Sequence, residues 1–328
     1  MLASDFDYIL PPERIAQAPI KPRDHSRLLV LDRKTGAMEH KHFFEIGEFL
    51  KPGDLLIVNE SKVFKARLVT TENVEIFLLR PDSDNWLALA KPGRKLSVGS
   101  IISFPNGTTA RVKNKHEDGT VSIDFATTPE TVFALAEQIG EVPTPPYVEK
   151  PPADATETYQ TVYAKSVGSV AAPTAGFHFT PELIEKLKEQ GIRFASITLH
   201  VGLGTFRPMK TETLEEHVMH EEWIDVPDET IKLIEETKKN GGRVIAVGTT
   251  TVRALESGTR HGFTKLFITP GFEFKTIDGM ITNFHLPKST LLVLVSSFAG
   301  RDNVLKAYST AIENEYRFYS FGDAMLIV

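Results

Sequence analysis

From Tyr159 to the C-terminus of this 328-residue chain, segments with strand and helix character alternate, and this alternation constrains the fold more than any other feature. The segment FASITLHV at 194–201 has the pattern of a buried strand, and RVIAVG at 243–248 repeats it. Alternating strands and helices imply a largely parallel sheet, whose ligands bind where the strands end. Helices are expected at 181–190, 228–240, 289–298 and 302–315, and further strands at 265–269, 280–284 and 324–328.

The N-terminal part supplies two more strands of this sheet. The segment at 27–32 and the continuous apolar run LLIVN at 55–59 are typical of buried strands. A helix is expected between them at 43–50, because Pro52-Gly53 ends the apolar pattern there.

Between residues 61 and 138 the pattern changes to short runs of strand-forming residues, separated by turns such as Pro105-Asn106-Gly107. Strands this short and this closely spaced favour a small antiparallel barrel. A helix from Thr128, ended by Gly140, and a proline-rich segment then lead the chain back. We therefore predict an α/β fold: a mixed, largely parallel sheet or open barrel from residues 1–60 and 148–328, with an inserted antiparallel β-barrel domain at 61–147.

Composition excludes several classes of protein. With 41% hydrophobic and 24% charged residues the chain has the make-up of a soluble, ordered protein. The absence of cysteine excludes disulfides, cysteine-ligated metals and a thiol nucleophile. A net charge of −6 argues against a generally basic nucleic-acid binder, although not against a local basic patch. The first residues do not resemble a signal peptide and the longest apolar run, at 291–295, is short, so we expect a cytoplasmic protein without a membrane span.

Four junctions between strands and the following segments share a high content of Gly, Thr, Ser, His and Arg. They lie at 172–180, 199–208, 247–253 and 282–290. If all four strands belong to one parallel sheet, these junctions lie on one rim and their polar groups converge on one pocket. Each junction alone is equally typical of a tight connection in an α/β sheet.

The first junction belongs to the small-residue segment SVAAPTAGFHFT at 169–180. If it is extended, Phe177 and Phe179 point to one face and His178 to the other. Thr180 and Pro181 have the residue types of an N-cap and a first helical position. A small-residue loop that leads into a helix lets backbone N–H groups approach a ligand closely.

The third junction, VGTTTVR, offers donors at a helix start. Thr249 and Thr250 supply hydroxyl and N–H groups, and Arg253 lies one turn further on. This arrangement suits a carboxylate or a phosphate, and it is equally compatible with an N-cap that binds nothing.

Four histidines are candidates for proton transfer. His178, His200 and His285 lie at strand ends on the predicted rim, where each alone is more typical of a hydrogen-bonded structural histidine. His220 follows His217 at a spacing of three, with acidic residues beside it. This pair lacks the HExxH pattern and a third ligand, so we expect no metal site.

These segments, in this order, resemble the S-adenosylmethionine:tRNA ribosyltransferase-isomerase family of queuosine biosynthesis. The resemblance runs nearly end to end and rests on long motifs. They include PGDLLIVN (52–59), GSVAAPTAGFHFT (168–180), TLHVGLGTFRP (198–208), IAVGTTTVRALES (245–257), TNFHLPKSTLLVLVSSFAG (282–300) and YRFYSFGDAMLI (316–327). The departures are mild: an altered run at 59–68, a short loop at 70–73, Thr251 in place of Ser and Met209 in place of Val.

The resemblance implies a reaction and its substrates. The ribosyl part of S-adenosylmethionine would move onto 7-aminomethyl-7-deazaguanine at the wobble position of a tRNA and rearrange to an epoxide, with adenine and methionine released. S-adenosylmethionine would be a consumed substrate, so no cofactor or metal is expected. The expected partner is the modified tRNA, there is no membrane partner, and the enzyme is expected to be a monomer.

The resemblance also implies roles for residues of the junctions. A base would remove a proton beside the sulfonium and an acid would protonate the departing adenine; the candidates are His178, His200, His220 and His285. Aromatic faces would meet the sulfonium, at Phe177, Phe179, Phe206 and Phe284. Thr249, Thr250 and Arg253 would hold the methionine carboxylate, Arg207 a phosphate or carboxylate, and Asp323 ribose hydroxyls or a purine.

Two other classes share parts of this pattern. An S-adenosylmethionine-dependent methyltransferase would use the same donor, but it would release adenosylhomocysteine instead of adenine. A non-catalytic RNA-binding module would use the small barrel as its reader, and it would leave the four polar junctions unexplained.

Overall fold

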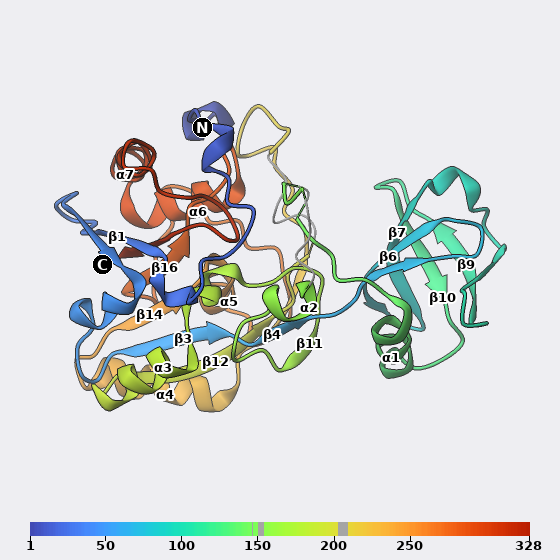
Figure 1. The fold of residues 1–328 in the computed structure, drawn as a ribbon, viewed down its shortest axis with the longest axis horizontal. Helices are drawn as coiled ribbons and strands as arrows, with labels where there is room; N and C mark the ends of the chain where they lie inside the picture. Colours follow the sequence, from blue (N-terminus) through green and yellow to red (C-terminus); the bar gives the residue numbers. More distant parts are fainter. Residues whose placement is uncertain (146, 150–153, 203–208) are drawn as a thin grey trace.

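The computed structural model describes residues 1–145, 147–149, 154–202 and 209–328. Its main body is built on a nine-stranded sheet with the order β15-β13-β12-β3-β14-β16-β17-β1-β2 (Figure 1). The strands are β1 (Arg27–Leu31), β2 (Met38–His42), β3 (Leu55–Asn59), β12 (Arg193–Leu199), β13 (Glu222–Asp225), β14 (Val244–Val247), β15 (His261–Thr264), β16 (Gly279–Asn283) and β17 (Ala324–Ile327).

The sheet is mixed, and it is less parallel than the sequence predicted. The central strands β12, β3, β14 and β16 run parallel, as do β1 and β17, whereas the other four neighbouring pairs are antiparallel. Parallel neighbours need a long crossover, which the helices provide in the centre of the sheet. At the edges the chain returns more directly, and β17 inserts antiparallel beside β16.

The central strands are apolar because both faces of the sheet are covered. All five residues of β3 are buried, and they alternate between two clusters. Leu56 and Val58 pack in the same core cluster as residues of α3 and η4, while Leu55 and Ile57 pack towards α4. The helices are α3 (Pro181–Glu189), α4 (Asp228–Lys239), α5 (Thr249–Glu256), α6 (Thr290–Ala299) and α7 (Arg301–Glu313). The expected helices at 181–190, 228–240, 289–298 and 302–315 are thus confirmed within a residue or two.

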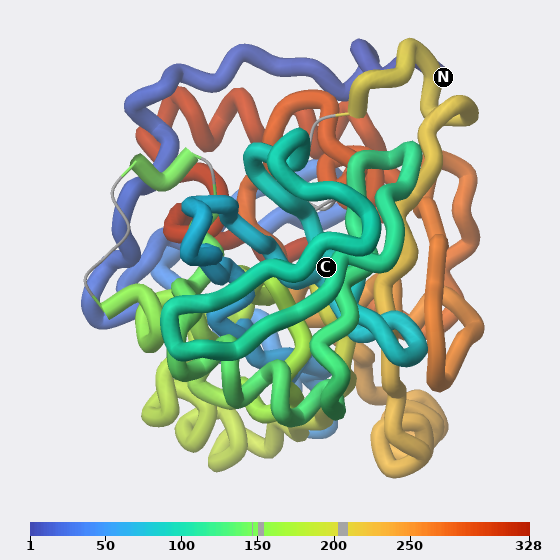
Figure 2. Tube along the Cα trace, turned by 90° about the vertical axis from the view of Figure 1, so that its right-hand side faces the viewer, coloured from blue at the N-terminus to red at the C-terminus, as the bar shows by residue number. Residues whose placement is uncertain are grey.

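A separate six-stranded antiparallel sheet lies at one end of the molecule (Figures 1 and 2). Its order is β5 (Arg67–Val69), β6 (Glu75–Asp82), β7 (Asn85–Lys91), β10 (Thr120–Asp124), β9 (Thr109–Lys115) and β8 (Ile101–Ser103). The sheet has its own core around Trp86 and Phe104, which α1 (Pro129–Ile139) covers in part. Thr71 N–H donates to the Ser103 carbonyl (2.9 Å), which links the chain beyond β5 to β8 at the other edge. Domain boundaries at 61 and 147 stay a prediction.

Short elements complete the fold. They are η1 (Ala3–Phe6), η2 (Pro12–Arg14), η3 (Arg23–His25), η4 (Phe43–Phe49), η5 (Gly93–Lys95), η6 (Thr174–His178), α2 (Ala155–Thr158), β4 (Ser61–Val63) and β11 (Ser166–Ser169). The strands β4 and β11 form a two-stranded parallel sheet beside the main body. Within the described residues, no helix combines the length and the apolar character that crossing a bilayer requires.

One local prediction was wrong. The strand expected at 265–269 is absent; the strand in this region is β15, which ends at Thr264 and pairs with β13. Leu266 and Ile268 are apolar because they pack in the main core, not because they alternate in a sheet. The helix expected at 43–50 is confirmed as the 3₁₀ helix η4, a short connector that packs Phe43 and Ile46 beneath the sheet.

Candidate active site

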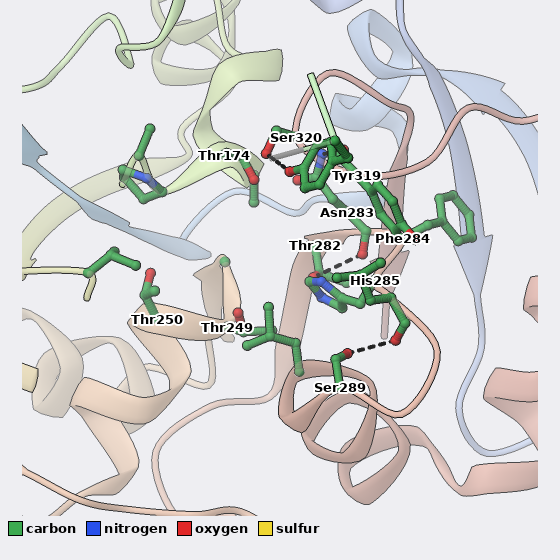
Figure 3. A pocket seen from close by; sticks show the side chains of 18 residues that line it. Thr174, Thr249, Thr250, Thr282, Asn283, Phe284, His285, Ser289, Tyr319 and Ser320 are labelled. Atoms are coloured by element: carbon green, nitrogen blue, oxygen red, sulfur yellow. Dashed lines mark hydrogen bonds between the residues drawn. The ribbon is translucent and has the colours of Figure 1, made fainter. Parts of the chain in front are cut away.

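The predicted convergence of the junctions is confirmed for three of them. One cavity, which we call the junction cavity, has walls from residues 172–175, 248–250 and 282–286 (Figure 3). Tyr147, Ser289, Leu291, Tyr319 and Ser320 also line it, and Val201 is the one lining residue from the fourth junction. These segments come from different crossovers, and the parallel centre of the sheet brings their ends to one rim. Residues 203–208, and with them Phe206 and Arg207, lie outside the described residues.

The small-residue segment at 169–180 is not extended where it carries Phe177 and His178. Residues 174–178 form the 3₁₀ helix η6, so successive side chains turn by about 120° instead of alternating. Phe177 consequently stacks near Phe321 (6.0 Å between ring centroids), while both His178 and Phe179 contact Phe43. The expectation that Phe177 and Phe179 share one face was therefore wrong.

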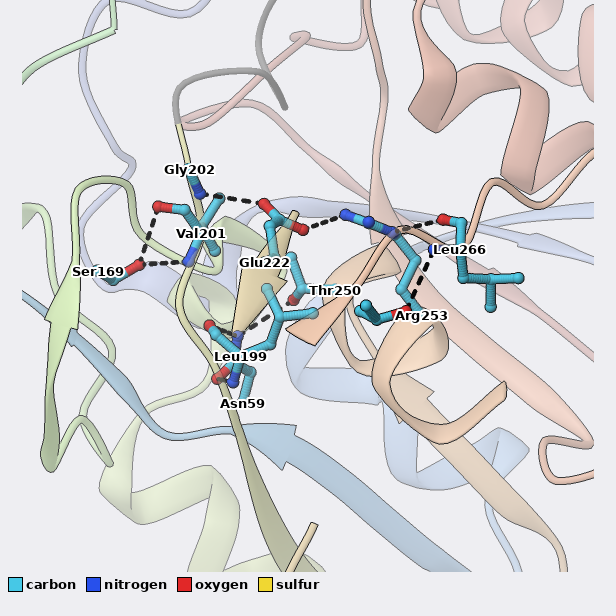
Figure 4. A network of polar contacts seen from close by, with 10 residues as sticks. Asn59, Ser169, Leu199, Val201, Gly202, Glu222, Thr250, Arg253 and Leu266 are labelled. Atoms are coloured by element: carbon cyan, nitrogen blue, oxygen red, sulfur yellow. Dashed lines mark hydrogen bonds and ion pairs between the residues drawn. The ribbon is translucent and has the colours of Figure 1, made fainter. Parts of the chain in front are cut away.

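Gly176 explains why this helix needs small residues. A Cβ at this position would lie 2.0 Å from the Tyr163 hydroxyl, so only glycine fits. Ser169 anchors the start of the segment, since its hydroxyl accepts from Val201 N–H (2.8 Å; Figure 4) and donates to the Ala171 carbonyl (2.6 Å). The segment is thus held against the end of β12, and one wall of the junction cavity is fixed.

His178 lies buried behind the cavity wall, with both ring nitrogens in contact with polar groups. Nδ1 lies 2.7 Å from Ser26 Oγ, and Nε2 lies 3.3 Å from Asn283 Nδ2. The Asn283 amide also donates to the Tyr319 carbonyl (3.0 Å), so Nε2 acts as the acceptor and Nδ1–H as the donor. Burial, with smaller effects of Arg317 and Arg23, lowers the pKa of His178 to about 3. The ring is neutral and both its nitrogens are engaged.

His285 lines the junction cavity itself and is only partly buried. Its Nε2 lies 2.8 Å from Thr282 Oγ1, whose hydroxyl also reaches the Asn283 carbonyl (3.3 Å). Tyr8 donates to the His285 carbonyl and the His285 N–H donates to Tyr308 Oη (3.0 Å), which fixes the backbone. Burial lowers the pKa of His285 to about 3, so this ring is neutral as well.

Helix α5 starts at the cavity. Gly248, with φ of +93°, turns the chain from β14 into the helix, and Thr249 and Thr250 line the cavity. Asn59 at the end of β3 connects this start to its neighbours: its amide donates to the Leu199 carbonyl (2.9 Å) and reaches Thr250 Oγ1 (3.3 Å). Asn59 is a site residue that the sequence-based prediction missed. Its position as the polar last residue of the apolar run LLIVN was a signal for it.

Arg253 points away from the junction cavity and forms a buried ion pair with Glu222 (Figure 4). Its Nε also donates to the Leu266 carbonyl (3.1 Å), and Glu222 accepts the N–H of Gly202 (3.0 Å). Arg253 thus already holds a carboxylate of the protein. Its expected contact with a substrate carboxylate stays a prediction.

The remaining expected residues of the junctions are largely core residues. Phe179 and Phe284 are fully buried, and Phe284 reaches the cavity from a cluster that contains Tyr308 and Phe318. Asp323 is buried and its carboxylate accepts the backbone N–H groups of Arg27 (2.9 Å) and Arg317 (2.7 Å). These contacts tie β17 to its surroundings.

His200 and His220 line a second space, which we call the sheet groove. It lies between the six-stranded sheet and the main body, has a volume of about 670 Å³, and meets the junction cavity at Val201. His200 Nδ1 lies 2.8 Å from Ser61 Oγ, and burial lowers the pKa of His200 to about 4. His220 is exposed at the rim of the groove. Of the four histidines, His285 thus lines the junction cavity, His200 and His220 line the sheet groove, and His178 lines neither.

In the described part of the chain, no group of three or more His, Asp or Glu side chains is arranged to hold a metal ion. The pair His217 and His220 is separated by its environment: His217 packs edge-on against Phe267, while His220 faces the groove.

Known proteins resemble this chain over its whole length. The family described as "Queuosine biosynthesis protein" matches residues 3–327. Proteins named S-adenosylmethionine:tRNA ribosyltransferase-isomerase from Moorella thermoacetica and Thermotoga maritima are each 52% identical to the chain, over the full length of both sequences. The crystal structure of S-adenosylmethionine tRNA ribosyltransferase from Thermotoga maritima superimposes with a TM-score of 0.59 at 42% identity, covering 99% of this chain and all of the other. The chain belongs to the queuosine biosynthesis protein family of S-adenosylmethionine:tRNA ribosyltransferase-isomerases.

Proposed function

We propose that this chain transfers and rearranges the ribosyl moiety of S-adenosylmethionine onto 7-aminomethyl-7-deazaguanine at the wobble position of tRNA. The products are epoxyqueuosine in the tRNA, adenine and methionine. The observation that carries the proposal is full-length identity of 52% to proteins named for this activity. The junction cavity supports it, because the motifs that carry the family resemblance supply its walls.

The charge of the junction cavity suits a sulfonium substrate. None of its described lining residues is a lysine or an arginine, and His285 is neutral. A positive sulfonium entering this space therefore meets aromatic rings, hydroxyls and an uncharged imidazole, which do not repel it. Phe284 and Tyr319 are aromatic residues of the cavity lining whose rings can face the sulfonium.

Among the four histidines, His285 is our first candidate for proton transfer. The Thr282 hydroxyl donates its proton to the Asn283 carbonyl, so its oxygen accepts a hydrogen bond from His285 Nε2–H. In this tautomer Nδ1 of His285 carries the lone pair. No described residue hydrogen-bonds Nδ1, so this lone pair is available to a substrate proton. His178, by contrast, has both nitrogens engaged behind the wall. Its role would be to hold Asn283 and η6 in place.

For the methionine carboxylate we propose the start of α5. Thr249 and Thr250 present N–H and hydroxyl groups there, and the helix dipole favours an anion. Arg253 would act indirectly, because its pairing with Glu222 holds α5 against β13. Phe177, Phe179 and Asp323 would support the walls, while Phe206 and Arg207 stay predictions outside the described residues.

We further propose that residues 61–147 form a barrel-like domain that contacts the tRNA, and that the enzyme acts as a monomer in the cytoplasm. The link from Thr71 to Ser103 supports the barrel, since it brings the two edge strands together.

One assay tests the function directly. The protein is incubated with S-adenosylmethionine and tRNA that carries 7-aminomethyl-7-deazaguanine, and the products are separated by mass. Free adenine and an epoxide-bearing nucleoside are expected. Adenosylhomocysteine would identify a methyltransferase instead, and tRNA binding without release of adenine would identify a non-catalytic RNA-binding module.

A further inference from the structure

Three flat side chains form a row across the edge of the nine-stranded sheet, beside the sheet groove. His200 follows β12, and its N–H donates to the Trp223 carbonyl of β13 (2.9 Å). Trp223 in turn lies directly opposite Phe263 of β15 in the antiparallel register. Directly opposite residues of antiparallel strands project to the same face, so the three rings lie side by side. We call these residues the aromatic row.

The rings of the row are ordered with respect to one another. His200 and Trp223 stack with centroids 5.1 Å apart and an interplanar angle of 17°. The imidazole is held from behind by Ser61, and a Cβ at Gly168 would come within 2.5 Å of His200 Nε2, so this ring has little freedom. His261 contacts Trp223 edge-on at 5.2 Å. Ser61, Gly168 and His261 thus hold the stacked pair of His200 and Trp223 in place.

The row faces the sheet groove, and core packing does not cover it. All three of its residues line the groove, Trp223 is only partly buried, and 46% of the Phe263 surface is exposed. The volume of about 670 Å³ lies within the usual range of roughly 300–1,000 Å³ for ligand pockets. Such an exposed aromatic surface marks an interaction site more often than a structural feature.

Across the groove, the six-stranded sheet contributes a cation to the end of the row. The Arg80 guanidinium lies 4.9 Å from the centroid of the Phe263 ring, and it also approaches Glu221 at 3.8 Å. Lys265 shares the same carboxylate at 3.0 Å. Arg80 also lies 3.6 Å from Asp82, so both cations pair only with exposed carboxylates, and either can turn to a phosphate without leaving a buried charge unpaired.

We propose that the aromatic row is a stacking platform for unpaired bases of the tRNA anticodon loop, with Arg80 and Lys265 next to the phosphates. The assignment rests on the proposed function for its choice of RNA. Sheets that recognise single-stranded RNA present aromatic side chains on which splayed bases stack. Stacking also suits a chain with a net charge of −6, which cannot depend on phosphate contacts alone. Because the groove and the junction cavity share Val201, a base on the row lies next to the space proposed for the ribosyl donor.

Binding of a fluorescein-labelled anticodon stem-loop RNA tests the platform without using turnover. We expect Phe263→Ala and Trp223→Ala each to raise the dissociation constant for RNA by about 5-fold or more, as expected for the loss of one base–aromatic stack. Phe263→Tyr, which keeps a ring, should restore binding, and S-adenosylmethionine affinity should not change. The matched control is Phe44→Ala, because Phe44 stacks on His42 (5.3 Å, 6°) beside β2 at the opposite edge of the sheet and should not affect RNA binding.

Tryptophan fluorescence gives a second readout that a structural role would not move. The chain has two tryptophans, and Trp86 is buried in the core of the six-stranded sheet. In a Trp86→Phe variant the emission of Trp223 should be quenched as RNA is added, in a saturable manner. Wild-type affinity of Phe263→Ala together with unchanged Trp223 emission would overturn the platform, as would an equal loss of affinity in Phe44→Ala. Absence of adenine release from the wild-type protein would instead refute the proposed function, and the binding data would still judge the row.

Discussion

The junction cavity and the sheet groove share Val201, and the groove has two ion pairs that hold their charges in opposite ways. Glu222, which lines the groove, pairs with the buried Arg253 at 2% and 4% side-chain exposure, and each makes further hydrogen bonds to the backbone. In the groove, Arg80 and Glu221 approach each other at 31% and 39% exposure and 3.8 Å. The first pair is part of the frame of the molecule. The second is loose enough to be replaced by a ligand.

The histidines follow burial more than region. Burial lowers the pKa of His178 and His285 on the cavity side and of His200 at the groove, whereas His220 is exposed at the groove. A frame whose polar groups satisfy one another suits a small, cationic substrate that must be held in one orientation. A groove with exposed rings and exchangeable ion pairs suits a larger partner that brings its own charges.

The largest difference between the two regions should appear in turnover. We expect His285→Gln to lower the rate with bound substrates by about 10²- to 10⁴-fold, because a placed acid or base contributes that much. The matched control is His116→Gln, which breaks a similar bond, from His116 Nε2 to Ser122 Oγ (2.8 Å), in the six-stranded sheet and should leave the rate near normal. Single-turnover release of adenine measures both variants. Near-normal turnover of His285→Gln would remove His285 from the proton-transfer candidates.

Truncation of one arginine of each ion pair tests the contrast between frame and surface. Arg253→Ala removes the cation of a buried, hydrogen-bonded ion pair, so we expect a loss of about 3–5 kcal/mol in the free energy of unfolding. Arg80→Ala removes only half-exposed contacts and should cost about 1 kcal/mol or less. Urea denaturation followed by circular dichroism measures both values. Equal losses for the two variants would show that both ion pairs belong to the frame of the molecule.

Acid should lower the free energy of unfolding, because buried neutral histidines beside the junction cavity take up protons only when the chain unfolds. The pKa of His178 is about 3 in the folded chain, against an ordinary value near 6.5 in the unfolded chain, so between these values the unfolded state binds one more proton. Stability is therefore complete above pH 6.5 and falls by about 1.4 kcal/mol per pH unit below it, for this residue alone. His285, with a pKa of about 3, adds to the slope.

Urea denaturation between pH 7.5 and pH 5 measures that slope. His178→Gln should make it shallower, whatever the variant does to stability at pH 7.5. A slope that His178→Gln leaves unchanged would mean that the buried ring is not responsible for the acid sensitivity.

The sequence allowed the junction cavity to be predicted because its walls depend on local signals. Thr249 follows an apolar strand, His285 follows another, and the sheet rule places both strand ends on one rim. The pairing of Arg253 with Glu222 could not be predicted from the sequence, because the two residues lie 31 positions apart and no local pattern relates them. The 3₁₀ turn at 174–178 was missed because a short polar–apolar alternation is also typical of a strand.

The sheet groove was out of reach for a different reason. The row of His200, Trp223 and Phe263 exists only because β12, β13 and β15 pair in one antiparallel register. The sequence analysis placed the third strand at 265–269, which would have put Phe263 outside the sheet. Surfaces between separate segments depend on register and packing, and neither is encoded in the periodicity of one segment.

The smallest effect separates two hydrogen bonds of the same kind. Ser26 holds the Nδ1 of His178 at 2.7 Å, and Ser61 holds the Nδ1 of His200 at 2.8 Å. In Ser26→Ala the imidazole stays fully buried with one nitrogen unsatisfied, which should cost about 1–3 kcal/mol of stability. In Ser61→Ala the His200 ring is only partly buried, so the loss should stay near the net value of a hydrogen bond, about 1 kcal/mol. RNA affinity should nevertheless fall in Ser61→Ala and not in Ser26→Ala, because only His200 supports the aromatic row. If both variants lose stability equally and neither affects RNA binding, the two histidines have the same structural role, and the division between cavity and groove does not extend to them.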